Sequence, residues 1–156
     1  MAALIERSIP EKAKTVRVHV GGDFFSQAYF DAWLLFAERH PEVTLYAYTK
    51  SIPYVKARWE RVQAAMNFRL TSSEGGKFDH YAEELGMIQA HVVMHPDEAA
   101  AMNLDIDHDD SHAINNTNSF ALLIHGTQPK DTDAAASLRK LKSENIQFAY
   151  TTKKNA

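Results

Sequence analysis

The sequence contains no cysteine among its 156 residues. Disulfide bonds, thiolate zinc sites, cysteine nucleophiles and any iron–sulfur cluster held by this chain's own thiolates are therefore excluded. An excess of basic residues is also missing, since 17 Lys and Arg stand against 20 Asp and Glu, for a formal charge of −3. This balance gives no chain-wide basic field that would recruit nucleic acid or an acidic membrane surface.

Long apolar runs are missing as well. No stretch approaches the roughly 20 apolar residues of a membrane span, and the start of the chain lacks the apolar core of a signal peptide. The composition is that of a folded globular chain, with 45% apolar and 24% charged residues. A chain of 156 residues also fits one domain of about 100 to 200 residues. We therefore expect a single domain over residues 1–156, located in the cytoplasm.

From Thr15 onward, short β-type runs alternate with amphipathic helical segments, which is typical of an α/β fold with a mainly parallel sheet. An antiparallel α+β sheet with one solvated face is the alternative. One predicted helix, from Gln27 to His40, follows Ser26 as its N-cap. Six strands are predicted: Thr15 to Val20, Val43 to Thr49, Asn67 to Thr71, Ile88 to His95, Phe120 to His125 and Ile146 to Thr151.

The predicted strands carry apolar and polar side chains at alternating positions, which point to opposite faces of a sheet. The apolar set includes Val20, Val92 and Leu122. A parallel sheet with helices on both faces is apolar on both. The alternation therefore predicts helices on one face and a polar lumen on the other, as in a partial β/α barrel. The polar set comprises Arg17, His19, Thr44, Tyr46, Tyr48, Asn67, Arg69, Thr71, Gln89, His91, His95 and His125.

Binding sites of parallel β/α folds lie at the carboxyl ends of the strands. After the first strand comes the sequence GGDFFS, whose glycines would let a ligand approach the backbone. A tight turn with Asp23 as an auxiliary cap is the alternative. No metal ligands and no catalytic set are predicted. We expect a small ligand to be bound by residues at these ends and in the lumen, namely Gly21, Gly22, Asp23, Arg17, His19, Tyr48, Lys50, Arg69, His95 and His125.

The segment from Asn103 to Ser119 has no helical or strand periodicity and includes four Asp and two His. We interpret it as a long loop, of the kind that is functional or mobile in compact domains. Its run DIDHDDSH is loosely similar to a calcium loop but lacks the expected Gly and Glu. A solvated loop and a hard-cation site both stay open.

Two stretches carry a family resemblance. VRVHVGGDFFSQAYFDAWLLFAERHPEVTLYAYTKS, from Val16 to Ser51, and FALLIHGTQP, from Phe120, resemble the C-terminal part of the phage family called gene product eighty-eight, which has no established activity. More distantly, the strand, GGD and helix resemble the start of a radical S-adenosylmethionine barrel. That resemblance implies S-adenosylmethionine as a cofactor, with Asp23 at the acidic position of its GGE-type loop. The cysteines upstream of this strand, which such enzymes need for their cluster, are absent.

Two functions follow as expectations. The first is an enzyme, or enzyme fragment, that binds a nucleoside-like or anionic small ligand at the carboxyl ends of its strands. The alternative is a non-enzymatic phage interaction protein. Without an upstream portion, the strand from Thr15 to Val20 would have an unpaired edge, and such edges invite pairing. We therefore expect a homo-oligomer, or a partner chain that closes the sheet, in the host cytoplasm.

Overall fold

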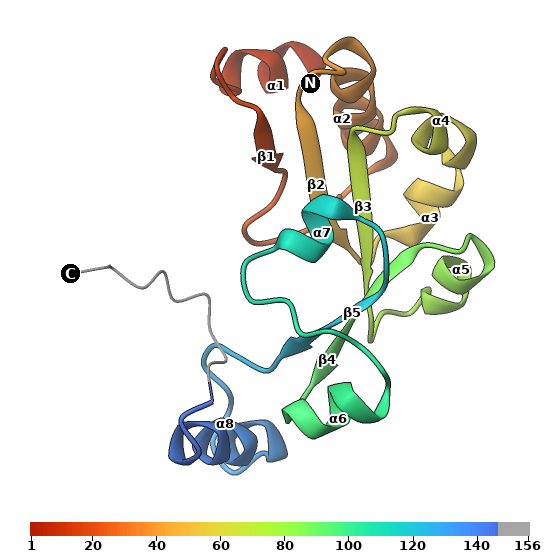
Figure 1. Cartoon of the computed structure of the whole chain (residues 1–156). Coiled ribbons are helices and arrows are strands. Elements are labelled where there is room, and N and C mark those ends of the chain that lie inside the picture. Colours follow the sequence, from red (N-terminus) through yellow and green to blue (C-terminus); the bar gives the residue numbers. More distant parts are fainter. Residues whose placement is uncertain (147–156) are drawn as a thin grey trace.

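A computed structural model describes residues 1–146 of the chain (Figure 1). Its described part contains a five-stranded sheet, and the predicted sixth strand, from Ile146 to Thr151, lies outside the described residues except for Ile146, which is not in a strand. The strands are β1 (Thr15–Arg17), β2 (Thr44–Thr49), β3 (Phe68–Ser73), β4 (Ile88–Val93) and β5 (Phe120–Leu123). The helices are α1 (Ala2–Ser8), α2 (Gln27–Arg39), α3 (Ile52–Lys56), α4 (Trp59–Ala64), α5 (Asp79–Glu84), α6 (Pro96–Ala101), α7 (Ser111–Asn115) and α8 (Asp133–Ser143).

The strands follow one another across the sheet in the order β1-β2-β3-β4-β5, and every neighbouring pair is parallel. Crossovers between parallel strands are right-handed, so an order without reversals brings the connecting helices to the same face. The sheet curls into half a barrel with helices α2 to α6 outside. The predicted α/β partial barrel is therefore confirmed, with five strands in place of six.

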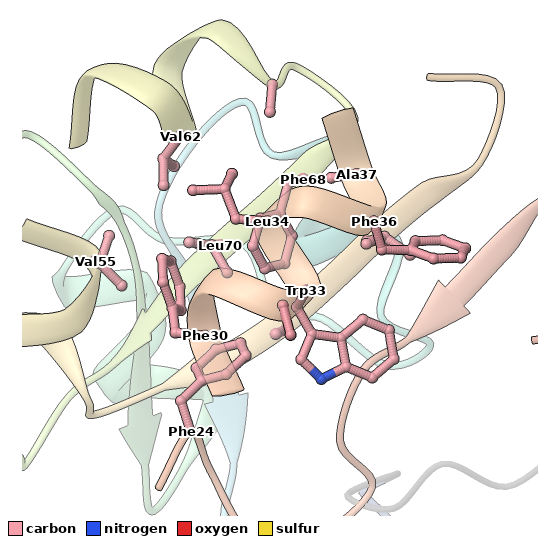
Figure 2. Packing of buried hydrophobic residues seen from close by; sticks show 14 of the residues in the cluster. Phe24, Phe30, Trp33, Leu34, Phe36, Ala37, Val55, Val62, Phe68 and Leu70 are labelled. Atoms are coloured by element: carbon pink, nitrogen blue, oxygen red, sulfur yellow. The ribbon is translucent and has the colours of Figure 1, made fainter. Parts of the chain in front are cut away.

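The main core lies between the convex face of the sheet and helices α2 to α5. Helix α2 begins at Ser26, whose side chain accepts a hydrogen bond from the N–H of Tyr29 at 3.2 Å, as the N-cap prediction requires. Its Phe30 and Leu34 are completely buried. Figure 2 shows these two side chains facing Phe68 and Leu70 of β3. This packing covers the convex face of the sheet.

The concave face is covered by a different element. Helix α7, in the middle of the 103–119 segment, packs across β2 and β3 (Figure 1). Its Ala113 is buried in a small cluster with Tyr46, Ala90 and Phe120. The segment predicted as a long loop therefore contains a short helix and fills the space that was expected to be a lumen.

The predicted polar face does not continue through β4 and β5. Paired residues of neighbouring strands point to the same side of a sheet. Tyr48 pairs with Thr71, Thr71 with Ile88, and Ala90 with Phe120, so the concave face is polar on β1 to β3 and apolar on the last two strands. The assignment of Val92 and Leu122 to the helix side was wrong, because these residues share the phase of Ala90 and Phe120. The assignment of Gln89 and His91 to the lumen was wrong for the same reason, since they have the opposite phase.

The two edges of the sheet differ. At β5, the N–H of Ala121 donates to Asp105 O at 2.8 Å, and its C=O accepts from Asp107 N at 2.9 Å, so residues 105–107 cover this edge. At the other edge, β1 ends at Arg17, three residues before the predicted end. Val20 has left the sheet and is 90% exposed, which contradicts its place in the apolar, buried set.

No helix among residues 1–146 is both long enough and apolar enough to cross a membrane.

Candidate functional site

Asp23, in the turn after β1, binds the chain itself. Its Oδ1 accepts hydrogen bonds from Phe24 N and the Thr49 hydroxyl, both at 2.7 Å. Its Oδ2 accepts from Lys50 N at 2.7 Å and from Ser51 N at 3.1 Å. A carboxylate has about four acceptor positions. All of them are used, so Asp23 ties the turn after β1 to the end of β2.

The concave face holds a second carboxylate, that of Asp110 at the start of α7. The Arg17 guanidinium donates to its Oδ2 at 2.7 Å, and the Tyr46 hydroxyl donates to the same atom at 3.0 Å. The Tyr48 hydroxyl donates to Oδ1 at 2.9 Å. We call Arg17, Tyr46, Tyr48 and Asp110 the carboxylate cluster. It brings together two predicted ligand residues, Arg17 and Tyr48, but around an anion of the chain's own.

The electrostatics of the carboxylate cluster keep the hydroxyl of Tyr46 protonated. Burial raises the pKa of Tyr46 to about 12, and the nearby Asp110 charge adds to the effect, because both oppose a phenolate. The guanidinium of Arg17 balances the carboxylate and also lies 5.2 Å from the ring centre of Tyr48. The Nε of Arg17 donates to the carbonyl of His19 at 2.9 Å, which fixes the plane of the guanidinium group. These contacts hold the Asp110 carboxylate on the concave face of the sheet.

The remaining predicted residues do not converge. Arg69 donates to the carbonyl of Ile114 in α7. The Nε2 of His19 is 3.2 Å from the Tyr29 hydroxyl, and burial lowers the pKa of this histidine. Gly22 has a φ of +84°, which suits glycine, and the open space around it and Gly21 sets no further requirement.

Three predicted residues lie near the carboxyl ends of β2, β4 and β5 in separate contacts. Lys50 donates to the carbonyl of Ser73 at 2.8 Å. The ring of His95 caps α6 through Nδ1, while its Nε2 lies 2.8 Å from a carboxylate oxygen of Glu144. His125 has its Nδ1 3.0 Å from Leu123 O. These contacts join neighbouring elements and assemble no common site.

A cavity of about 370 Å³ lies at the opposite, amino ends of β3 and β4. Trp59, Met66, Arg69, Met87 and Asn116 are among its lining residues. Within residues 1–146, no group of three or more His, Asp or Glu side chains is arranged to hold a metal ion. In the DIDHDDSH run, Asp107 instead accepts from the backbone N–H groups of Asp109 and His112.

Comparison with protein families matches residues 1–145, nearly the whole chain, to the family described as Gene product 88. The chain belongs to this family. It is the phage family that the GGDFFS and FALLIHGTQP stretches resembled. Comparison with curated proteins and with solved structures gave no match. The gene product 88 match carries no radical S-adenosylmethionine assignment.

The residues of this gene product 88 protein do not fit S-adenosylmethionine at the GGD turn. The resemblance implied that Asp23 contacts the amino group of the cofactor. Both oxygens of Asp23 already accept two hydrogen bonds each from the chain. A further donor would have to displace one of them. The turn is therefore a structural clamp in this protein.

Sequence reasoning missed the central member of the carboxylate cluster. Asp110 stood in a run of acidic residues that was interpreted as a solvated loop or a hard-cation site, and Tyr46 was in the polar set but was not selected. Asp110 is 93 residues from Arg17 in the sequence. The available signal was the pair of tyrosines and an arginine in the same phase on neighbouring strands, which together favour an anion.

Proposed function

We propose that this gene product 88 protein is a non-enzymatic interaction protein that pairs with a second copy of itself through the outer edge of β1. The difference between the two sheet edges carries the proposal. Residues 105–107 hydrogen-bond to the β5 edge, whereas no strand within residues 1–146 pairs with β1 on its outer side. Unpaired edges are templates for another chain.

The backbone of β1 suits self-pairing. The N–H of Val18 donates to Tyr46 O of β2 at 3.0 Å, so even-numbered residues face β2. The backbone groups of Thr15 and Arg17 therefore point outward. Antiparallel pairing about a two-fold axis at Val16 sets Thr15 of one copy opposite Arg17 of the other. Each such pair can exchange two hydrogen bonds, and a two-fold dimer is the commonest oligomer.

Exposed apolar side chains also lie in the segments that flank β1 in the sequence. Of the seven large apolar residues that are exposed in the described part of the chain, four precede or follow β1 within the first 25 residues: Met1, Leu4, Val20 and Phe25. Phe25 is 70% exposed and stacks on Tyr29 at 4.5 Å. Figure 1 places α1 at one end of β1 and the turn that follows β1 at the other. Burial of such side chains would add to backbone pairing.

The engagement of the predicted ligand residues favours this function over an enzyme. Asp23 is saturated by backbone and hydroxyl donors, and Arg17 and Tyr48 hold Asp110. A catalytic group needs a free atom within reach of a substrate. In the closed arrangement of the loop, both oxygens of Asp23 and the groups of Arg17 and Tyr48 that face Asp110 already have partners within the chain.

Light scattering after size exclusion tests the proposal. We expect the wild type to have twice the mass of the chain and Thr15→Pro to have the mass of one chain. Proline removes the outward N–H of Thr15 and leaves the bonds to β2, which use even-numbered residues. Thr15→Val keeps the N–H and is the matched control, so it should stay a dimer. A monomeric wild type, or a dimeric Thr15→Pro, would contradict the proposal.

A further inference from the structure

We propose that Arg17, Tyr46 and Tyr48 form a binding site for the carboxylate of a small ligand, which Asp110 of the chain's own loop occupies until a ligand takes its place. This inference goes beyond pairing, because the site lies on the concave face and uses side chains, not the β1 edge. The Asp110 carboxylate shows which ligand group the site accepts, since three side-chain donors already hold it at 2.7 to 3.0 Å. Such charge-assisted bonds are strong.

The site is built independently of the loop. Arg17, Tyr46 and Tyr48 come from β1 and β2, where Arg17 and Tyr46 are register partners. The carbonyl of His19 orients the Arg17 guanidinium group. The donors therefore stay in place if the loop leaves. The Arg17 side chain is 31% exposed, compared with 9% for Asp110, so a ligand can approach from the Arg17 side.

A second observation points to a ligand larger than the Asp110 carboxylate. Thr71 is completely buried on the same face, directly opposite Tyr48 in the neighbouring strand, and its hydroxyl has no hydrogen-bond partner. Buried hydroxyls without a partner are costly. In the loop above, buried atoms of His112 and Asn116 also lack hydrogen bonds. The closed interface thus leaves polar groups unsatisfied, and a carboxylate ligand with a further hydroxyl or amino group would satisfy Thr71.

The loop has the features of an exchangeable cover. Its backbone reverses at Asn103, Asp110 and Asn116, which have φ values of 54°, 65° and 52°. Asn and Asp tolerate this left-handed region better than other residues with side chains. Helix α7 between these points has only five residues and no side-chain cap at its N-terminus. Its hold on the sheet depends on Asp110, the Arg69 contact and a few apolar side chains.

Replacement of Asp110 by glycine tests the site directly. Asp110→Gly removes the equivalent of one acetate ion and places glycine where φ is +65°, which glycine adopts without strain. We expect sodium acetate to raise the thermal midpoint of Asp110→Gly in a saturable way, above the effect of sodium chloride at equal ionic strength. In Asp110→Gly with Arg17→Gln, the acetate concentration needed for the same shift should rise at least about tenfold.

Asp131→Gly is the matched control. Asp131 also has a left-handed φ, 61°, but it is exposed. Its variant should respond equally to acetate and chloride. Equal responses of Asp110→Gly to the two salts, or rescue that persists without Arg17, would overturn the proposal. If Asp110→Gly does not fold, the hydrogen-exchange comparison in the wild type tests the site without a substitution at this position.

Displacement of the loop is tested in the wild type by hydrogen exchange. Acetate competes with Asp110 for the same donors, so we expect faster amide exchange in residues 111–115 in acetate than in chloride. If amide exchange is unchanged at acetate concentrations that saturate Asp110→Gly, Asp110 is a permanent anchor. That result would overturn the proposal that a ligand replaces Asp110. Neither outcome depends on the mass of the protein, so failure of the pairing proposal is distinguishable.

Discussion

Two aspartates have different roles in this protein, because Asp23 fixes a local turn whereas Asp110 joins a loop to distant strands. Asp23 is satisfied mainly by backbone donors within one turn and the neighbouring strand end, so its role is local. Asp110 is satisfied by side chains of β1 and β2, far away in the sequence. The sequence could predict that Asp23 follows a strand. It could not predict the partners of Asp110, because these depend on which face the loop crosses.

His19 gives the protein a pH dependence at the residue scale. Burial lowers its pKa, and this effect outweighs the nearby charge of Asp23, which acts in the opposite direction. A lowered pKa in the folded state means that folding disfavours the protonated ring. The stability from neutral His19 is therefore fully present above about pH 6.5, the ordinary value for histidine, and is lost as the pH falls through the folded pKa.

The measurement is the free energy of unfolding by urea at about pH 7.5 and about pH 5. We expect the loss on acidification to be smaller in His19→Gln, which keeps a polar group near Tyr29 but does not titrate in this range. His108 is exposed, and His108→Gln serves as the control that should keep the wild-type loss. An equal loss in wild type and His19→Gln would show that His19 does not contribute.

At the scale of elements, periodicity predicted where the strands lie in the sequence better than it predicted which residues face the helices. The N-cap of α2 was predicted, and β2 matches its predicted range within one residue. In β4, however, Ile88, Ala90 and Val92 are apolar in one phase and Val93 in the other. Such a strand does not reveal which set faces the helices. The choice is made by its register with β3 and by the packing of Val93 near Leu141 of α8.

Asn67 joins two elements in a way that the sequence did not indicate. Its side-chain amide lies 2.9 to 3.0 Å from the carbonyl oxygens of Ala37, His40 and Val43, between the end of α2 and the start of β2. These carbonyls belong to a helix end, where the chain itself provides no donors. One amide therefore stabilises the whole α2–β2 connection.

Replacement of Asn67 should destabilise this connection. We expect Asn67→Ala to lower the free energy of unfolding by about 1–3 kcal/mol, the usual cost of partly buried groups that lose their partner. Asn67→Asp should cost more, because a carboxylate would face three carbonyl oxygens without a donor. Urea unfolding measures both, with the exposed Asn115→Ala as control. An Asn67→Asp variant as stable as wild type would contradict this role.

For the whole molecule, the partial barrel was predictable because alternation of strands and helices specifies a parallel sheet with helices on a shared face. The open lumen was not, because Ala113 and Asp110 fill the concave face from a segment with no periodicity. The predicted ligand residues Arg17 and Tyr48 meet there, while Asp23, His95 and His125 lie in separate contacts. The polarity pattern of one strand cannot reveal its contacts with a loop that connects strands at the other edge of the sheet.

Self-pairing also predicts a property of the whole molecule in solution. Association stabilises the folded state by mass action, so the thermal midpoint of a dimer rises with protein concentration. We expect such a rise for the wild type and Thr15→Val, and a constant midpoint for Thr15→Pro. Differential scanning calorimetry over a hundredfold range of concentration provides the measurement. A wild-type midpoint that is independent of concentration would contradict pairing at the β1 edge.

The strand order also has a consequence for synthesis of the chain. Each strand pairs with the one made just before it, so β1 to β3 and their helices can assemble while the remainder is still being translated. The contact between Arg17 and Asp110 spans 93 residues and cannot form until the 103–119 segment has left the ribosome. Once β1 and β2 have paired, Arg17, Tyr46 and Tyr48 lack their Asp110 partner until that segment arrives. The carboxylate site proposed above would therefore be open to small carboxylates in the cell before Asp110 reaches it.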